Sequence, residues 1–123
     1  MSKTIAIIGA SPDRERFANK AMRAWQKQGW TVIPVHPKHT EIEGLKTYPT
    51  LADIPGAVDV ASLYVSPKVG ITVLEAIAAK GIKDVYVNPG AESDELVQKA
   101  ESLGLQPIVA CSILAIGEHP SSY

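Results

Sequence analysis

The stretch that most constrains the fold lies at the start of the chain. Residues 4–8 read TIAII, a continuously apolar run, and Gly9, Ala10 and Ser11 follow directly. Such a run is typical of a strand buried on both faces of a sheet. Small residues after it let the backbone approach a ligand closely, and a helix that starts next offers free N–H groups and the positive end of its dipole. This stretch therefore predicts a strand, an anion-binding turn and a helix.

Strand and helix patterns alternate along the rest of the chain. Apolar residues at helical spacing precede a strand-like run at 31–35, and the alternation continues through strand-like runs at 60–65, 84–87 and 106–109. Strands alternating with helices indicate a parallel sheet covered on both faces. We therefore predict an α/β fold, a single three-layer α/β/α Rossmann-like domain over residues 1–123. The predicted strand order of the mainly parallel sheet is 3-2-1-4-5-6, with a short strand 3 at Lys46–Tyr48.

Length and composition limit the classes of function. A chain of 123 residues can bury one core, and its net charge of −1 lacks the basic excess of proteins that bind nucleic acid or anionic membranes. The single cysteine, Cys111, cannot form an internal disulfide, and residues 1–3 do not resemble a secretion signal. We expect a cytoplasmic protein with a small-molecule ligand and with neither nucleic-acid nor membrane partners. A homodimer is possible on base rates.

The predicted topology brings four turns together. In an open α/β sheet the ligand lies beyond the carboxyl ends of the strands, near the point where strand order reverses. The turns expected there are the Gly9–Ser11 turn and three others, which contribute the candidate ligand-binding residues His36, Pro37, Lys38, Val65, Ser66, Pro67 and Asn88. In the helix that Ser66 and Pro67 would begin, we expect a buried stripe of Val69, Val73, Ala76 and Ile77.

The turn after the second strand discriminates between nucleotides. A typical NAD site has an acidic residue near the end of that strand, and the sequence has none there. A lysine, Lys38, and the imidazoles of His36 and His39 instead suit a phosphorylated ribose, as carried by coenzyme A or NADP. The glycine fingerprint is also incomplete, because Ser11 and Arg14 stand where its second and third glycines would be.

Cations cluster where the first helix is expected to begin. Arg14, Arg16 and Lys20 would oppose the helix dipole unless an anion compensates them, so they favour a phosphate ligand. Pro12 has no N–H to offer, which leaves the amides of Ala10, Ser11 and Asp13 as the expected cradle.

No catalytic or metal-binding pattern accompanies this turn. The three histidines and Cys111 lack metal-ligand spacing, and no serine stands in a G-x-S-x-G elbow. Cys111 itself is expected to be an inert buried thiol. We therefore predict no catalytic residues and no metal, and a binding protein rather than an enzyme.

Several short motifs resemble those of a known family. They are Gly9-Ala10-Ser11 with Arg16, the segment Pro34–Pro37, Tyr48-Pro49-Thr50-Leu51, and Ile54-Pro55 before Val58-Asp59. With them the chain resembles the small coenzyme A-binding family of single Rossmann-type domains, similar to the amino-terminal domain of the succinyl-CoA synthetase alpha subunit. The resemblance implies that the Gly9–Ser11 turn and Arg16 handle a pyrophosphate. It also implies that the His36–Lys38 turn lies near the phosphorylated ribose and that Val65–Pro67 border the adenine.

The function predicted from the sequence is accessory, non-catalytic binding of coenzyme A or an acyl derivative. Two alternatives remain open at this point, an NADP-dependent oxidoreductase and a nucleotide-responsive regulatory or interaction module. The oxidoreductase is disfavoured because a dehydrogenase normally adds a substrate domain, whereas this sequence ends once the predicted sheet is complete.

Overall fold

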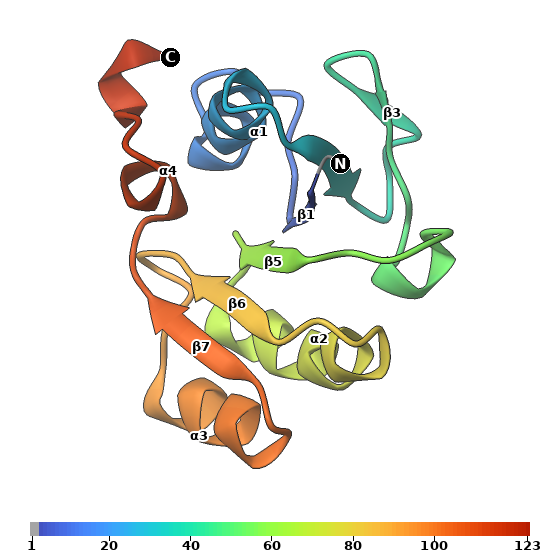
Figure 1. The fold of residues 1–123 in the computed structure, drawn as a ribbon, viewed down its shortest axis with the longest axis vertical. Coiled ribbons are helices and arrows are strands. Elements are labelled where there is room, and N and C mark those ends of the chain that lie inside the picture. Colours follow the sequence, from blue (N-terminus) through green and yellow to red (C-terminus); the bar gives the residue numbers. More distant parts are fainter. Residues whose placement is uncertain (1–2) are drawn as a thin grey trace.

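The computed structural model describes residues 3–123 and has an α/β fold (Figure 1). Five parallel strands form one sheet in the order β2-β1-β5-β6-β7. Their bounds are β1 Thr4–Ile8, β2 Thr31–Val35, β5 Val60–Leu63, β6 Asp84–Val87 and β7 Gln106–Val109. The helices are α1 Phe17–Lys27, α2 Pro67–Ala79, α3 Asp94–Ser102 and α4 Ser112–Ala115, with single 3-10 turns η1 Leu51–Asp53 and η2 Pro120–Ser122.

Helices cover both faces of the sheet, as the Rossmann-like prediction requires. The alternation of side chains along β1 shows the division: Ile5 and Ile7 pack into a core with α1 and α4, whereas Ala6 and Ile8 pack into a core with α2 and α3. Figure 1 shows α1 and α4 on one side of the strands and α2 and α3 on the other. Within residues 3–123, no helix is both long enough and apolar enough to cross a membrane.

The predicted third strand is reduced to a single bridge. Tyr48 lies beside Val35, at the edge where the strand was expected, and exchanges two backbone hydrogen bonds with Pro34 and His36. The preceding residues pair elsewhere, because β3 (Glu41–Ile42) and β4 (Leu45–Lys46) form a small antiparallel hairpin of their own. Pro49 lacks an N–H and prevents the pairing from continuing beyond Tyr48. The main sheet thus has the predicted order without its third member.

A buried polar network joins the sheet to α4. The side-chain nitrogen of Asn88, Nδ2, donates to Ser62 Oγ and to the Leu63 carbonyl, both at 2.8 Å. Its side-chain oxygen, Oδ1, accepts the Ser112 N–H at 2.9 Å. Ser62 Oγ also donates to Ser112 Oγ at 3.1 Å. Asn88, Ser62 and Ser112 are at most 1% exposed. The network therefore fixes the segment after β7 to the end of β5.

Substituting Asn88 should destabilise the fold. The Asn88→Ala change leaves the Ser112 N–H and the Leu63 carbonyl with fewer partners in a buried place, at an expected cost of about 2–3 kcal/mol. Urea unfolding measures this cost, with Ser102→Ala on the exposed surface of α3 as the control, expected to stay within about 0.5 kcal/mol. Equal stabilities for the two variants would contradict the role given to Asn88.

Gly9 occupies a position that no other residue type fits. Its φ is +89°, and a Cβ built there would lie 2.5 Å from the Tyr64 carbonyl oxygen and 2.8 Å from Val65 Cγ1. The turn after β1 thus passes in close contact with the end of β5. Gly81, which follows α2, has a similar φ of +81°, but a Cβ there would meet nothing within 4 Å.

These two glycines separate a steric effect from a conformational one. Gly81→Ala should cost about 1–2 kcal/mol of unfolding free energy, because only the left-handed backbone is disfavoured. Gly9→Ala adds a clash with the backbone of Tyr64, directly after β5, and should cost about 1–3 kcal/mol more. Denaturant unfolding of both variants tests the comparison, and a Gly9→Ala variant as stable as Gly81→Ala would show that the close approach is not needed.

Candidate functional site

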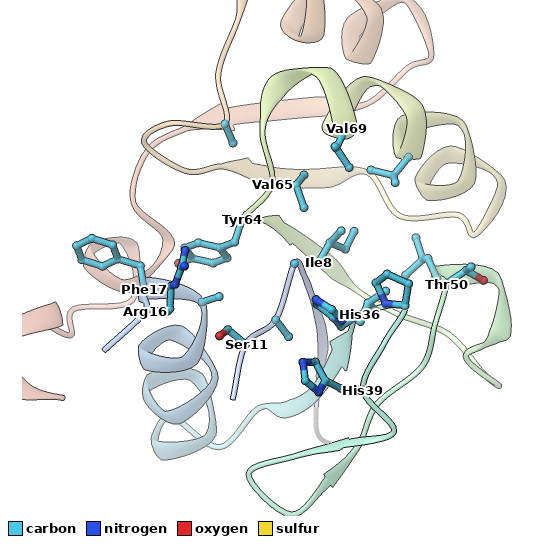
Figure 2. A pocket seen from close by; sticks show the side chains of 18 of the residues that line it. Ile8, Ser11, Arg16, Phe17, His36, His39, Thr50, Tyr64, Val65 and Val69 are labelled. Carbon is cyan, nitrogen blue, oxygen red and sulfur yellow. The ribbon is translucent and has the colours of Figure 1, made fainter. Parts of the chain in front are cut away.

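A large pocket lies at the carboxyl ends of the strands. Its volume is about 1120 Å³. The turn after β1 and the start of α1 form one side. The segments after β2 and β5, the start of η1, one face of α2 and the turn after β6 form the rest. Figure 2 shows Arg16 and Phe17 at one end of this pocket and Thr50 at the other, with His36 between them. This is the place where the topology predicts a ligand.

Helix α1 begins at this pocket without a cap. Its N-cap residue, Arg16, makes no side-chain cap hydrogen bond, and the first turn holds no acidic residue. The starts of α2 and α3 differ, because Ser66 accepts the Val69 N–H and Ser93 accepts the Leu96 N–H. No group within residues 3–123 accepts a hydrogen bond from the amides of residues 17–19. The α1 terminus therefore has donors and a positive dipole end to offer to an anion.

The amides of the turn before α1 are only partly available. The Gly9 and Ala10 N–H groups both donate to the Val35 carbonyl, at 3.1 and 3.2 Å, and the Asp13 N–H donates to Ser11 Oγ at 3.1 Å. Two of the three amides expected to form the cradle, those of Ala10 and Asp13, are thus already bonded within the protein. Among the described residues, nothing accepts from the Ser11 N–H. Among the residues that line the pocket, the Ser11 amide and those of Phe17 and Ala18 have no acceptor within residues 3–123.

The two arginines of this segment have different positions. The sequence places both at the start of the first helix, but α1 begins only at Phe17, so Arg14 lies in the preceding loop. Arg14 Nε lies 3.6 Å from Glu43 Oε2 in the β3–β4 turn, and Arg14 does not line the pocket. Arg16 does line it, with its Nε 4.0 Å from Asp13 Oδ2. Both pairs are solvent-accessible, so their attraction is weak.

A buried asparagine that the sequence analysis did not single out holds the turn in place. Asn19 is fully buried in α1, and its side-chain nitrogen donates to the Ser11 carbonyl at 2.9 Å and to Glu43 at 3.3 Å. Arg23 donates to Asn19 Oδ1 and to the Arg14 carbonyl, both at 2.9 Å. The signal that could have revealed Asn19 in the sequence is its polar side chain, since the other buried residues of this helix are small or apolar.

The segment after β2 reaches the pocket through three of its residues. His36, Pro37 and His39 line it, whereas the side chain of Lys38 lies outside. The Lys38 N–H donates to His36 Nδ1 at 3.0 Å, which turns the chain back so that the two rings come within 4.6 Å of each other, centroid to centroid. Burial, together with His39 and Lys38, lowers the pKa of His36.

The opposite wall is apolar and comes from the end of β5 and from α2. Val65 lines the pocket, but Ser66 and Pro67 do not, because Ser66 caps α2 and Pro67 begins it. The stripe expected to be buried under α2 is divided. Ile77 is in the core, whereas Val69, Val73 and Ala76 face the pocket, Val69 being 48% exposed. Three of the four residues expected to be buried under α2 thus line the pocket.

Asn88 was predicted to contact the ligand, and the structure gives it another role. All of its side-chain hydrogen-bonding groups are used by the buried network, and the pocket is instead lined by the neighbouring Pro89, Gly90 and Ala91. Of the candidate residues, Gly9, Ala10, Ser11, Arg16, His36, Pro37 and Val65 line the pocket, whereas Arg14, Lys38, Ser66, Pro67 and Asn88 do not.

Two reactive side-chain types lie near the pocket. The Tyr64 hydroxyl lies 3.1 Å from Ser112 Oγ, and burial is the main cause that raises the pKa of Tyr64 to about 12, so it is neutral at physiological pH. Cys111 is half-buried and does not line the pocket. Within residues 3–123, no three His, Cys, Asp or Glu side chains gather as a metal site would require.

The pocket residues missed by the sequence analysis come from three places. Phe17 follows the predicted turn after β1, Thr50 and Leu51 lie at the start of η1, and Thr72 lies on α2. Their positions depend on how the η1 segment folds back beside α2, which periodicity does not reveal.

Sequence comparisons connect the chain with coenzyme A enzymes. The ADP-forming acetate-CoA ligase I of Archaeoglobus fulgidus is 32% identical over 114 residues, which cover 85% of this chain and 17% of the ligase. The alpha subunit of the ADP-forming acetate-CoA ligase II of Pyrococcus furiosus is 31% identical over 115 residues, 85% of this chain and 25% of that subunit. The chain therefore spans a quarter or less of the length of these two relatives.

Solved structures and a family profile agree with this relationship. A conserved hypothetical protein from Pyrococcus furiosus superposes with a TM-score of 0.84 at 33% identity, covering 94% of this chain and 99% of that one. The dinucleotide-forming acetyl-coenzyme A synthetase 1 of Candidatus Korarchaeum cryptofilum, solved with phosphate and ADP, superposes with a TM-score of 0.77 at 30% identity, covering 88% and 25%. The profile of the family described as CoA binding domain matches residues 3–117. The chain therefore belongs to the CoA-binding domain family.

Proposed function

We propose that this protein binds coenzyme A or an acyl-coenzyme A in the pocket at the carboxyl ends of the strands, as an accessory and non-catalytic binding domain. The observation that carries the proposal is the uncapped start of α1, where Phe17 and Ala18 line the pocket together with Ser11 and their amides have no acceptor within residues 3–123. A pyrophosphate is the part of the ligand that this arrangement suits, since several donors converge on one region and the helix dipole adds to their attraction.

The size and the lining of the pocket support a ligand of this kind. A volume of about 1120 Å³ is at the upper end of small-molecule sites, which typically hold about 300–1,000 Å³. The polar end at Ser11 and Arg16 suits phosphates, and the apolar wall of Val65, Val69 and Val73 suits a base or the pantetheine arm. A long ligand with a charged middle and less polar ends would use both parts.

The alternatives expected from the sequence are an NADP-dependent enzyme and a regulatory or interaction module. The two ligases compared with this chain are named for coenzyme A, and neither name mentions NADP. The ligases continue well beyond the region that matches, so their reactions are not carried over to this chain.

Calorimetry with coenzyme A, acetyl-coenzyme A and NADP tests the proposal. We expect saturable binding of the first two with a stoichiometry of one per chain, and a rise in the melting temperature that grows with ligand concentration. Binding of NADP without binding of coenzyme A would favour the oxidoreductase alternative. If neither coenzyme A nor NADP binds, the result would favour the regulatory or interaction module.

Arg16 should contribute to affinity through its charge. Arg16→Ala removes the one arginine or lysine side chain that lines the pocket within residues 3–123, and we expect coenzyme A to bind about three- to tenfold more weakly, because an exposed charged contact is worth about 1 kcal/mol. Lys83→Ala is the matched control, since it removes the same charge at the start of β6, at the other end of the sheet. An equal loss of affinity in both variants would mean that only net charge matters and would contradict a contact by Arg16.

A further inference from the structure

An exposed aromatic ring lies at one end of the pocket. Phe17 is the first residue of α1, lines the pocket and is 59% exposed. It packs into neither of the two apolar cores, and the Lys20 ammonium lies 5.8 Å from the centre of its ring. Phe17 therefore offers to the pocket an apolar surface that the fold itself does not use.

A second aromatic ring lies at the same end. Tyr64 follows β5 directly and lines the pocket, and Figure 2 shows it with Phe17 and Arg16 on the side opposite Thr50. The Tyr64 ring packs against the core between the sheet and α1, and its hydroxyl lies 3.1 Å from Ser112 Oγ in the buried network. Because the hydroxyl is engaged there, what Tyr64 presents to the pocket is its ring.

The side-chain acceptors of the turn before α1 are already engaged. Ser11 Oγ accepts the Asp13 N–H at 3.1 Å, and Asp13 Oδ1 accepts the Glu15 N–H at 3.0 Å. The other carboxylate oxygen of Asp13 lies 4.0 Å from Arg16 Nε. Sugar hydroxyls placed against the two rings would lose water without gaining free partners, which costs free energy. This end of the pocket therefore suits an apolar group better than a sugar.

The unbonded amides divide the pocket into two arms. Those of Ser11, Phe17 and Ala18 have no acceptor within residues 3–123, and they suit a pyrophosphate. One arm extends from them toward η1 along the apolar wall that begins at Val65, which can enclose a flat base. The other arm reaches Phe17 and Tyr64. Coenzyme A is divided in the same way, because its pyrophosphate joins adenosine to a pantothenate arm whose dimethyl-substituted carbon lies next to the phosphate ester.

We infer that Phe17 and Tyr64 bind the dimethyl part of this pantothenate arm, and that the contact makes the pocket prefer coenzyme A to nucleotides that carry a sugar beyond the pyrophosphate. This inference rests on the proposed function, because it assumes that the pyrophosphate of coenzyme A lies at the start of α1. The contact removes apolar surface of Phe17 from water, so it contributes affinity without a charge or a hydrogen bond. Adenine and pyrophosphate cannot supply this selectivity, since NADP carries both.

Calorimetry on Phe17→Ala with two ligands tests the inference. 3′-Phosphoadenosine 5′-diphosphate keeps the base, the ribose phosphate and the pyrophosphate of coenzyme A and lacks the pantothenate arm. The variant should bind coenzyme A about five- to tenfold more weakly, the loss expected when about 40–55 Å² of apolar contact is removed, and the truncated ligand less than about twofold more weakly. Each ligand is compared between proteins, because the truncated ligand ends in a phosphate that carries an additional charge.

Three further variants separate the apolar contact from other effects. Phe17→Leu keeps an apolar side chain and should bind coenzyme A within about twofold of the unmodified protein. Tyr64→Phe keeps the ring, so its affinity for coenzyme A should be unchanged, although loss of the bond to Ser112 should lower its melting temperature. Leu114→Ala is the control, because Leu114 is 54% exposed on α4 and does not line the pocket.

The possible results distinguish this inference from the proposed function. Equal losses for both ligands in Phe17→Ala would show that residue 17 acts through the start of α1, and would overturn the inference. Unchanged binding of coenzyme A in Phe17→Ala would overturn it as well and leave the proposed function intact. Weaker binding of coenzyme A by Tyr64→Phe would show that the hydroxyl meets the ligand, against an apolar contact there. If the unmodified protein does not bind coenzyme A, the proposed function itself fails.

Discussion

The turn on which the site depends is held by one backbone oxygen. The Val35 carbonyl accepts the N–H groups of both Gly9 and Ala10, so the chain leaving β1 is bonded to β2 for two residues beyond the end of the strand. The Tyr64 N–H donates to the Ile8 carbonyl at 2.8 Å and ties the same turn to β5. With both neighbours bonded in this way, the first unbonded amide along the chain is that of Ser11. The position of the binding site follows from the point where these backbone bonds end.

The second half of the turn is held by side chains of α1. Asn19 fixes the Ser11 carbonyl, and Arg23 fixes the Arg14 carbonyl, so the loop cannot fold inward over the start of the helix. Glu43 Oε2 pairs with Arg14 and also accepts a hydrogen bond from the side-chain nitrogen of Asn19. This ion pair draws one cation away from the pocket and leaves Arg16 at its rim. The hairpin of β3 and β4 thus takes part in the site without lining it.

The sequence could predict the layers of the fold because each rests on local periodicity. The buried strands and the serine cap of α2 follow from patterns a few residues long, and the order of the five paired strands follows from the Rossmann-like topology that their alternation with helices indicates. The missing third strand could not be predicted, because it depends on whether Leu45 and Lys46 pair with β2 or with their own neighbours. The same limit applies to the site. Gly9 and Ser11 were found from a turn pattern, whereas the roles of Asn19, Asn88 and Val69 depend on which side chains meet in three dimensions.

The pocket joins a polar end to an apolar wall. Ser11 and Arg16 line the polar end, and Val65, Val69 and Val73 line the wall. Backbone amides and a helix dipole carry no titrating proton, so the attraction that the start of α1 offers to an anion does not change across the physiological pH range. Only the side chains of the lining can make such an attraction depend on pH, because the backbone part of it is set by the fold alone.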